Sequence, residues 1–410
     1  MKVRCFYLST CLTLFTGWLV YALAGNTLAH AIAGRFGGSL LRFGRGKFND
    51  PAVFVQHRLQ EILWLVTLAL LCFTLQWWIS TILRTRKLSR AVWAVNGLTG
   101  FVFINIWTGF AANTATFWAM LGIGAGVQNY MQFNFKRIIA TEVQTPMRAI
   151  LMGSSQTRTQ IDENLLNQRL GTKLWTTELH FPGAKAFDLL LLEPQLTRIH
   201  PDLVICYFSE GYLYLGSNGE TAPNFLSFQQ LPDVWRVGAL KYLTREQVAY
   251  GLTGSLLPLF RCRDAISQRL LGEEVMHLNQ TAYVAGLVEN LEDRAKTNAT
   301  QFHINQESDF QKRTLEEFVA RCTAANCQVI FLAGGYNPIL TRQMSPAIRQ
   351  DMLRFFRELQ ACHRNLIVVS EADMPSQTAA DYDDLNHVNS EMQRKFSEYL
   401  AEFLKAYISR

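Results

Sequence analysis

The stretch Ala149-Ile150-Leu151-Met152-Gly153-Ser154-Ser155 decides the fold of this chain, because four apolar residues run without interruption into a polar turn. Three other segments have the same apolar texture: Leu203–Cys206, Val329–Leu332 and Leu366–Val369. Apolar runs without polar alternation are typical of strands that are buried on both faces of a parallel sheet. The four runs therefore predict buried parallel strands.

Amphipathic helical patterns lie between and after these runs. Each of three sets places its apolar residues on one helical face: Leu315, Phe318, Val319 and Cys322; Ile348, Met352, Phe355 and Leu359; Met392, Phe396, Tyr399, Leu400 and Phe403. Strands that alternate with helices predict the α/β class, with a doubly wound, mostly parallel sheet flanked by helices. The functional site of such a sheet forms at the carboxyl ends of the strands.

Two motifs at those ends carry chemistry. Ser155 follows the first run, and Asp384-Leu385-Asn386-His387 comes after the last. A serine hydroxyl becomes a nucleophile when an imidazole takes its proton, and a carboxylate fixes the tautomer of that imidazole. We therefore predict Ser155 as nucleophile, His387 as base and Asp384 as its orienting carboxylate. The alternative is a capping serine and a solvated histidine at a helix start capped by Asp384.

The order of these motifs resembles that of the SGNH (GDSL-like) hydrolase superfamily, whose first motif is Gly-Asp-Ser and whose last is Asp-x-x-His. Gly153-Ser154-Ser155 has Ser154 in place of Asp. This Gly-Ser-Ser version is similar to that of the membrane-anchored branch that acylates cell-envelope polymers, including the proteins of teichoic acid D-alanylation and alginate acetylation. The resemblance covers roughly residues 146–405 and implies an SGNH-like fold with acyl-transfer or ester-hydrolysis chemistry.

The resemblance also implies two oxyanion positions. The second family motif supplies a glycine N–H, and Gly183 after Phe181-Pro182 matches it by position. The third motif, Gly-x-Asn-Asp, supplies an asparagine that is missing from the loop Phe208-Ser209-Glu210-Gly211, where Ser209 is the candidate substitute. The missing asparagine argues against efficient free hydrolysis more than it argues against the SGNH-like fold. A plain bend at Gly183 and an ordinary turn at Glu210-Gly211 are the alternatives.

Residues 1–135 have the composition of a transmembrane region, whereas residues 136–410 read as a globular domain. Spans are expected near 5–24, 62–83 and 91–110, since each is long and apolar enough to cross a bilayer. The first ends in Ala22-Leu23-Ala24, so it is either an uncleaved anchor or a cleaved signal peptide. The segment 115–133 is richer in Gly, Asn and Gln and reads as a fourth span or an interfacial segment.

The number of spans decides the compartment. The dense basic loop from Arg84 to Arg90 is expected in the cytoplasm. With three spans the globular domain lies on the periplasmic side of a bacterial inner membrane, and with four it is cytoplasmic. We expect three, because the fourth candidate is the most polar, although the basic residues of the 25–58 loop complicate the charge rule.

Residues 215–305 interrupt the strand–helix rhythm and predict a helical insertion, with one helix near Arg245 to Leu257. The insertion caps the site, docks on the membrane or a partner, or is plain helical packing. Eight cysteines without paired C-x-x-C spacing predict no metal site, and no cofactor is expected. Cys322 and Cys327 form either a disulfide or two buried thiols.

The expected function is that of a multi-pass membrane protein with a serine acyltransferase or esterase domain. The net charge of +6 lies largely in loops beside apolar segments, so no nucleic-acid partner is expected. The resemblance implies a polysaccharide or other cell-envelope polymer as acceptor and a separate multi-span membrane O-acyltransferase as partner. A non-catalytic assembly component of a polysaccharide secretion complex is the main alternative. A cytoplasmic-facing lipase or thioesterase, which needs four spans, is the third.

Overall fold

The computed structural model describes residues 59–85, 90–121, 127–140, 145–171, 173–216, 222–271 and 290–409. The expected span at 5–24 lies outside these residues. The chain divides into two compact units. Of the described residues, 59–140, 226–231 and 248–271 form the first unit, and the others form the second.

The second unit is built on a five-stranded, all-parallel sheet with strand order β2-β1-β3-β4-β5. Its strands are β1 (Met147–Gly153), β2 (Leu174–His180), β3 (Leu203–Phe208), β4 (Gln328–Ala333) and β5 (Leu366–Ser370). Four of them contain the four apolar runs, so the predicted α/β class with a parallel sheet is confirmed. The sequence analysis missed β2, an edge strand whose sequence Leu-Trp-Thr-Thr-Glu-Leu-His is not a continuous apolar run.

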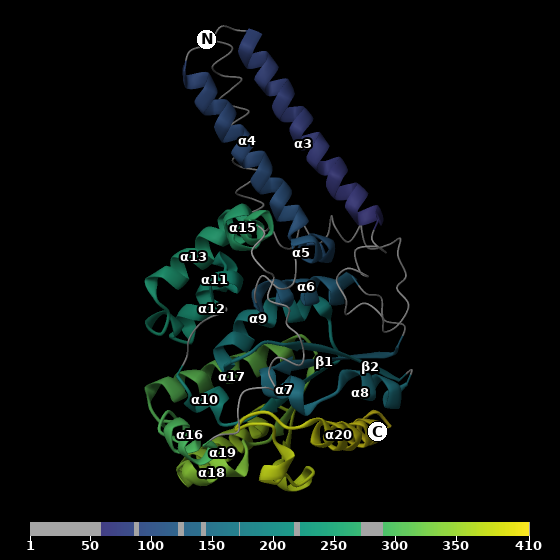
Figure 1. Cartoon of the computed structure of the whole chain (residues 1–410), viewed down its shortest axis with the longest axis vertical. Helices are drawn as coiled ribbons and strands as arrows, with labels where there is room; N and C mark the ends of the chain where they lie inside the picture. Colours follow the sequence, from purple (N-terminus) through teal and green to yellow (C-terminus); the bar gives the residue numbers. More distant parts are fainter. Residues whose placement is uncertain are drawn as a thin grey trace. The chain divides into compact units, whose positions relative to one another are not determined.

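Helices pack on both faces of this sheet (Figure 1). On one face, α20 (Ser390–Ile408) contributes Phe396 and Leu400 to a core that includes Ile205 of β3 and Ile330 of β4. The short helices α7 (Ser155–Gln160) and α8 (Glu163–Leu170) lie on this same side. Because α7 begins at Ser155, this layer carries the nucleophile candidate.

The opposite face is covered by α9 (Ala186–Ile199), α17 (Gln306–Ala324) and α19 (Pro346–Cys362). Phe208 of β3 and Phe331 of β4 contact Phe356 of α19, with ring centroids 5.6 Å apart in both pairs. The remaining helices of the second unit are short: α10 (Gly211–Tyr214), α11 (Ala222–Phe225), α12 (Leu231–Arg236), α16 (Leu291–Ala299) and α18 (Pro338–Gln343). Cys322 and Cys327 are free, buried thiols, which agrees with the thiol interpretation.

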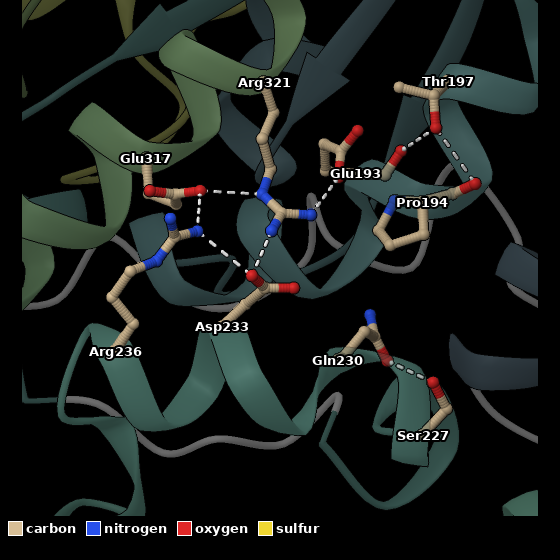
Figure 2. Close-up of polar contacts among 9 residues, drawn as sticks. All are labelled: Glu193, Pro194, Thr197, Ser227, Gln230, Asp233, Arg236, Glu317 and Arg321. Carbon is tan, nitrogen blue, oxygen red and sulfur yellow. Dashed lines mark hydrogen bonds and ion pairs between the residues drawn. The ribbon is translucent and has the colours of Figure 1, made fainter.

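An ion-pair cluster fixes the beginning of the insertion to this helix layer (Figure 2). Arg321 of α17 pairs with Glu193 of α9 at 3.2 Å, with Glu317 at 2.9 Å and with Asp233 of α12. Arg236 of α12 also pairs with Asp233, at 3.0 Å, and with Glu317. Burial raises the pKa of Glu193, and the guanidinium of Arg321 offsets part of that rise. The cluster therefore neutralises a buried carboxylate and anchors α12.

The first unit contains α3 (Leu59–Thr85) and α4 (Arg90–Ala111), which coincide with the predicted second and third spans. Gln76 of α3 donates to Asn96 Oδ1 of α4 at 2.7 Å, and Trp107 Nε1 donates to the Leu65 carbonyl at 3.1 Å. Among the described residues, one helical stretch, Glu61–Ile82, is long and apolar enough to cross a membrane, with a mean hydropathy of 2.0.

The expected fourth span, 115–133, corresponds to α5 (Ala115–Leu121) and the start of α6 (Val127–Ala140), and residues 122–126 lie outside the described part. Because α6 continues to Ala140, it runs through the predicted domain boundary at 135/136. The division between the compact units falls after Thr141. The number of spans stays a prediction.

The described part of the insertion is helical, as predicted. Its residues 226–231 and 248–271 belong to the first unit, whereas 232–247 and α16 belong to the second. The insertion contains α13 (Arg245–Leu256), α14 (Pro258–Arg261) and α15 (Arg263–Leu271), together with the 3₁₀ turns Phe228–Gln230 and Ala239–Lys241 nearer its start. The Leu259 N–H donates to Asn105 Oδ1 of α4 at 3.3 Å, and Cys262 joins an apolar cluster with Leu65 and Ala111. Residues 248–271 therefore pack on the apolar helices.

Candidate active site

The turn after β1 presents Ser155. Ser154 is the N-cap of α7, because its hydroxyl accepts the Gln156 N–H at 3.2 Å, and Ser155 is the first helical residue. Any side chain at Gly153, where φ is +156°, would overlap Thr157 and Tyr212. The tight strand-to-helix turn therefore requires glycine. The capping role belongs to Ser154, which leaves the Ser155 hydroxyl available to another partner.

The structure brings together the three residues that the sequence singled out as catalytic candidates. His387 Nε2 lies 2.9 Å from Ser155 Oγ, and His387 Nδ1 lies 2.8 Å from Asp384 Oδ2. The imidazole thus stands between the hydroxyl and the carboxylate, although Ser155 and His387 are 232 positions apart in the sequence. Both distances are within hydrogen-bonding reach, as proton transfer requires.

Asp384 also shapes the loop that carries His387. Its Oδ1 accepts the N–H groups of Asn386 at 2.6 Å and of His387 at 2.7 Å. Burial by itself would raise the pKa of Asp384, but the hydrogen bond and charge of His387 and the two N–H donors hold that pKa below its usual value. Because Asn389 is the N-cap of α20, Asp384 does not cap that helix.

Two residues that the sequence analysis missed hold this loop in place. Asn337, buried in the loop after β4, donates its side-chain amide to the Asp384 carbonyl at 3.0 Å, and its N–H donates to the Leu385 carbonyl at 3.1 Å. Gln156 donates to the Asn386 carbonyl at 3.3 Å. Both follow strand ends closely, so the rule that sites form at the carboxyl edge of the sheet could have pointed to them.

The loop after β3 is buried and hydrogen-bonded. Ser209 is fully buried, and its hydroxyl donates to Gln156 Oε1 at 2.5 Å. The oxyanion role of Ser209 stays a prediction, and it would require this hydroxyl to change partners. The buried Glu210 pairs with Arg349 at 3.1 Å, and Gly211 begins α10. Burial raises the pKa of Glu210, and the charge of Arg349 opposes that rise.

Arg349 connects three neighbouring strand ends. Besides Glu210 after β3, it donates to the Ala333 carbonyl at the end of β4 at 3.0 Å and pairs with Glu371 after β5 at 2.5 Å. A planar guanidinium with five donors can satisfy several acceptors at once. Arg349 therefore braces the carboxyl edge of the sheet, and nothing in the sequence pattern singled it out.

Gly183 lies in an exposed turn after β2 with φ at +73°. The preceding Phe181 N–H donates to the Gly153 carbonyl at 3.0 Å, which holds the start of this turn beside the end of β1. An added Cβ would meet no atom within 4 Å, so only the left-handed backbone favours glycine here. This geometry fits a bend, and the role of the Gly183 N–H as an oxyanion donor stays a prediction.

The sequence matches no protein-family model and no curated protein. Similar solved structures include a candidate acylhydrolase from Bacteroides fragilis NCTC 9343, at 12% identity and a TM-score of 0.33, covering 70% of this chain and 96% of that one. Another is an α/β hydrolase from the metagenome of Lake Arreo, Spain, at 14% identity and a TM-score of 0.30, covering 65% and 96%. At these TM-scores neither likeness carries an argument, so the class of the fold rests on the sheet itself.

Proposed function

We propose that this chain is a membrane-anchored serine acyltransferase or esterase of the SGNH type. The single observation that supports it is the hydrogen-bonded series Ser155, His387 and Asp384 at the carboxyl edge of the sheet. This geometry provides a hydroxyl, a base within reach of its proton and a carboxylate that orients the base. The other described features of the edge, Asn337 and Arg349, brace the loops around it.

In the proposed mechanism, Ser155 Oγ attacks the carbonyl carbon of an acyl donor while His387 Nε2 takes the hydroxyl proton. The leaving group departs with that proton, and the acyl group remains esterified to Ser155. An acceptor hydroxyl, or water, then gives its proton to His387 and attacks the ester carbonyl. The bond between Ser155 Oγ and the acyl carbon breaks, the acyl group leaves on the acceptor, and His387 returns the proton to Ser155 Oγ. We assign the oxyanion to the N–H groups of Ser155 and Gly183, with Ser209 as a further candidate; one such donor is typically worth about 3–4 kcal/mol.

The substrate belongs to the proposal and rests on the Gly-Ser-Ser resemblance. We propose a cell-surface or exported polysaccharide as acceptor and a separate multi-span membrane O-acyltransferase as the source of acyl groups. The competing proposal is a non-catalytic assembly component of a polysaccharide secretion complex, favoured by the loop Ser209-Glu210-Gly211, which lacks the family asparagine. The intact Ser155, His387 and Asp384 arrangement favours the enzyme.

Labelling with a fluorophosphonate probe tests the nucleophile on the full-length protein. Wild-type protein is expected to label at Ser155 and to hydrolyse p-nitrophenyl acetate, whereas Ser155→Ala should lose both while its thermal unfolding changes little. Ser154→Ala is the matched control, because it removes the neighbouring cap at a cost of about 1 kcal/mol but keeps the nucleophile. Full activity in Ser155→Ala would leave the assembly role as the better proposal.

We further propose three spans and a periplasmic α/β unit in a bacterial inner membrane. The helices α3 and α4 and the basic residues from Arg84 to Arg90 support this topology. Alkaline phosphatase needs export to form its disulfides, so a fusion after Arg410 is expected to be active. An inactive phosphatase fusion beside a fluorescent cytoplasmic reporter would indicate four spans, and an exported polymer could then not reach Ser155.

A further inference from the structure

Gln156, the residue after the proposed nucleophile, forms hydrogen bonds through both the oxygen and the nitrogen of its side-chain amide. Gln156 is 6% exposed, its Oε1 accepts the Ser209 hydroxyl at 2.5 Å, and its Nε2 donates to the Asn386 carbonyl at 3.3 Å. Ser209 follows β3, and Asn386 lies in the loop before α20. One buried amide therefore joins the turn that carries Ser155 to two loops that are distant in the sequence.

The hydrogen bond from Gln156 to the Asn386 carbonyl holds the loop that carries His387, the proposed base. The Asn386 carbonyl and the His387 N–H belong to the same peptide group. Gln156 holds the oxygen of this peptide group, and Asp384 Oδ1 accepts its N–H at 2.7 Å. A peptide group is planar and rigid. The hydrogen bonds to its carbonyl oxygen and to its N–H therefore fix the backbone nitrogen of His387 relative to α7, which begins at Ser155.

The same geometry assigns the Ser209 hydroxyl. A carbonyl oxygen is only an acceptor, so the NH₂ end of Gln156 must face Asn386 and its oxygen must face Ser209. The single O–H hydrogen of Ser209 is therefore donated to Gln156 Oε1. While this hydrogen bond exists, the Ser209 hydroxyl has no hydrogen left for an oxyanion.

From these contacts we infer that Gln156 is a positioning residue that sets the register between Ser155 and His387, and that the Ser209 hydroxyl acts on the reaction through Gln156. The inference rests on the proposed serine mechanism. It replaces direct oxyanion contact by Ser209 with indirect support of the base. Gln156 itself touches neither substrate nor reacting atoms in this assignment.

The first test measures kcat and KM separately with p-nitrophenyl acetate on the full-length protein. Gln156→Met keeps the length of the side chain and removes both hydrogen bonds, so kcat should fall by about 10- to 100-fold with little change in KM, as expected for a misplaced base. Gln311→Met is the control, because Gln311 is fully buried and its Oε1 accepts the Phe187 N–H at 2.9 Å, away from the base loop. The control should lose stability but keep its kcat.

A double-mutant cycle then separates the two roles of Ser209. If Ser209 acts through Gln156, Ser209→Ala lowers kcat in the wild-type background and has almost no further effect in Gln156→Met. If Ser209 contacts the oxyanion directly, its removal should cost about 10²- to 10³-fold in both backgrounds. Should Gln156→Met fail to fold, Gln156→Leu, which also removes both hydrogen bonds and adds no charge, takes its place in the cycle.

Additive effects, or an unchanged kcat in folded Gln156→Met, would overturn this inference. The proposed serine mechanism would survive either result as long as Ser155→Ala is inactive and the fluorophosphonate labels the wild type. Activity that persists in Ser155→Ala would instead remove the proposed function on which the inference depends. The two failures are therefore distinguishable.

Discussion

Helices α3 and α20 are both long and both rich in apolar residues, yet they use those residues in opposite ways. In α3, Phe73 is 71% exposed and Trp77 is 62% exposed. In α20, Phe396 and Leu400 are fully buried against the sheet. The apolar residues of α20 lie on one face, whereas those of α3 lie around the helix.

The two helices therefore suit different surroundings. A helix that is apolar on one face has a protein core as its partner, and a helix that is apolar all round needs a core or a membrane. The exposed apolar surface of α3 has no protein partner within the first unit that covers it, among the residues that the structure describes. In the second unit, the side chains of Ser155 and His387 meet at the carboxyl edge of the sheet, where they lie 2.9 Å apart.

The largest expected effect concerns the assignment of chemistry to the second unit. Asp384→Asn should lower kcat by about 10³- to 10⁴-fold, because an amide cannot hold the imidazole of His387 in the required tautomer. Esterase assays with p-nitrophenyl acetate measure this loss, and circular dichroism checks folding. Asp383→Asn is the matched control, since Asp383 precedes Asp384 and its N–H, not its side chain, contacts the His387 carbonyl. Equal activity in both variants would contradict the assignment.

The next effect tests the core role of α20. Phe396→Ala should lower the free energy of unfolding by about 3–5 kcal/mol, because it removes a fully buried ring and leaves a cavity beside Tyr207. Urea unfolding of the detergent-solubilised protein, followed by a signal from the second unit, measures the change. A loss below about 1 kcal/mol would mean that the α20 face is not packed as the structure shows.

A smaller effect concerns pH and a buried carboxylate of the second unit. Asp351 accepts a hydrogen bond from Tyr214 at 2.9 Å and pairs with Lys312. Burial opposes ionisation, but these partners outweigh it and lower the pKa of Asp351. Its contribution to stability is therefore present above about pH 4, the usual carboxyl value, and is lost as the pH falls through the lower folded-state pKa.

Asp351→Asn should accordingly cost about 1–3 kcal/mol at pH 7 and less under acid conditions. Unfolding measured between pH 7 and pH 2 should give two stability curves that converge toward low pH. Curves that stay parallel throughout this range would show that the stabilisation by Asp351 does not depend on its charge.

The smallest effect completes the contrast with Phe396. Phe73→Ala should change the unfolding free energy of the protein by no more than about 0.5 kcal/mol, because the side chain packs against little protein. Urea unfolding followed by a signal from the first unit, which contains α3, measures it, with the Phe396→Ala series as the reference. A loss comparable to that of Phe396→Ala would show that a protein surface covers α3, and would remove the support for a lipid-facing helix.

The sequence by itself determined the class of the fold and the identity of the three catalytic candidates. Strands β1, β3, β4 and β5 were predictable because burial on both sheet faces demands a continuous apolar run, which is a local property of composition. Ser155, Asp384 and His387 were singled out as candidates because their chemistry limits the residue types that can serve, because each follows a predicted strand, and because the order of their motifs resembles that of the SGNH superfamily. The edge strand β2 was not predicted, because its sequence is not a continuous apolar run.

Only the tertiary structure decided how those residues are held. Gln156, Asn337 and Arg349 hold the site through hydrogen bonds to loops that lie far away in the sequence. The partner of the Ser209 hydroxyl was equally unpredictable, although the residue itself was singled out. Apolar burial leaves a periodic trace along the chain, whereas a hydrogen bond between two loops depends on where the folded sheet brings them, and that position leaves no local pattern.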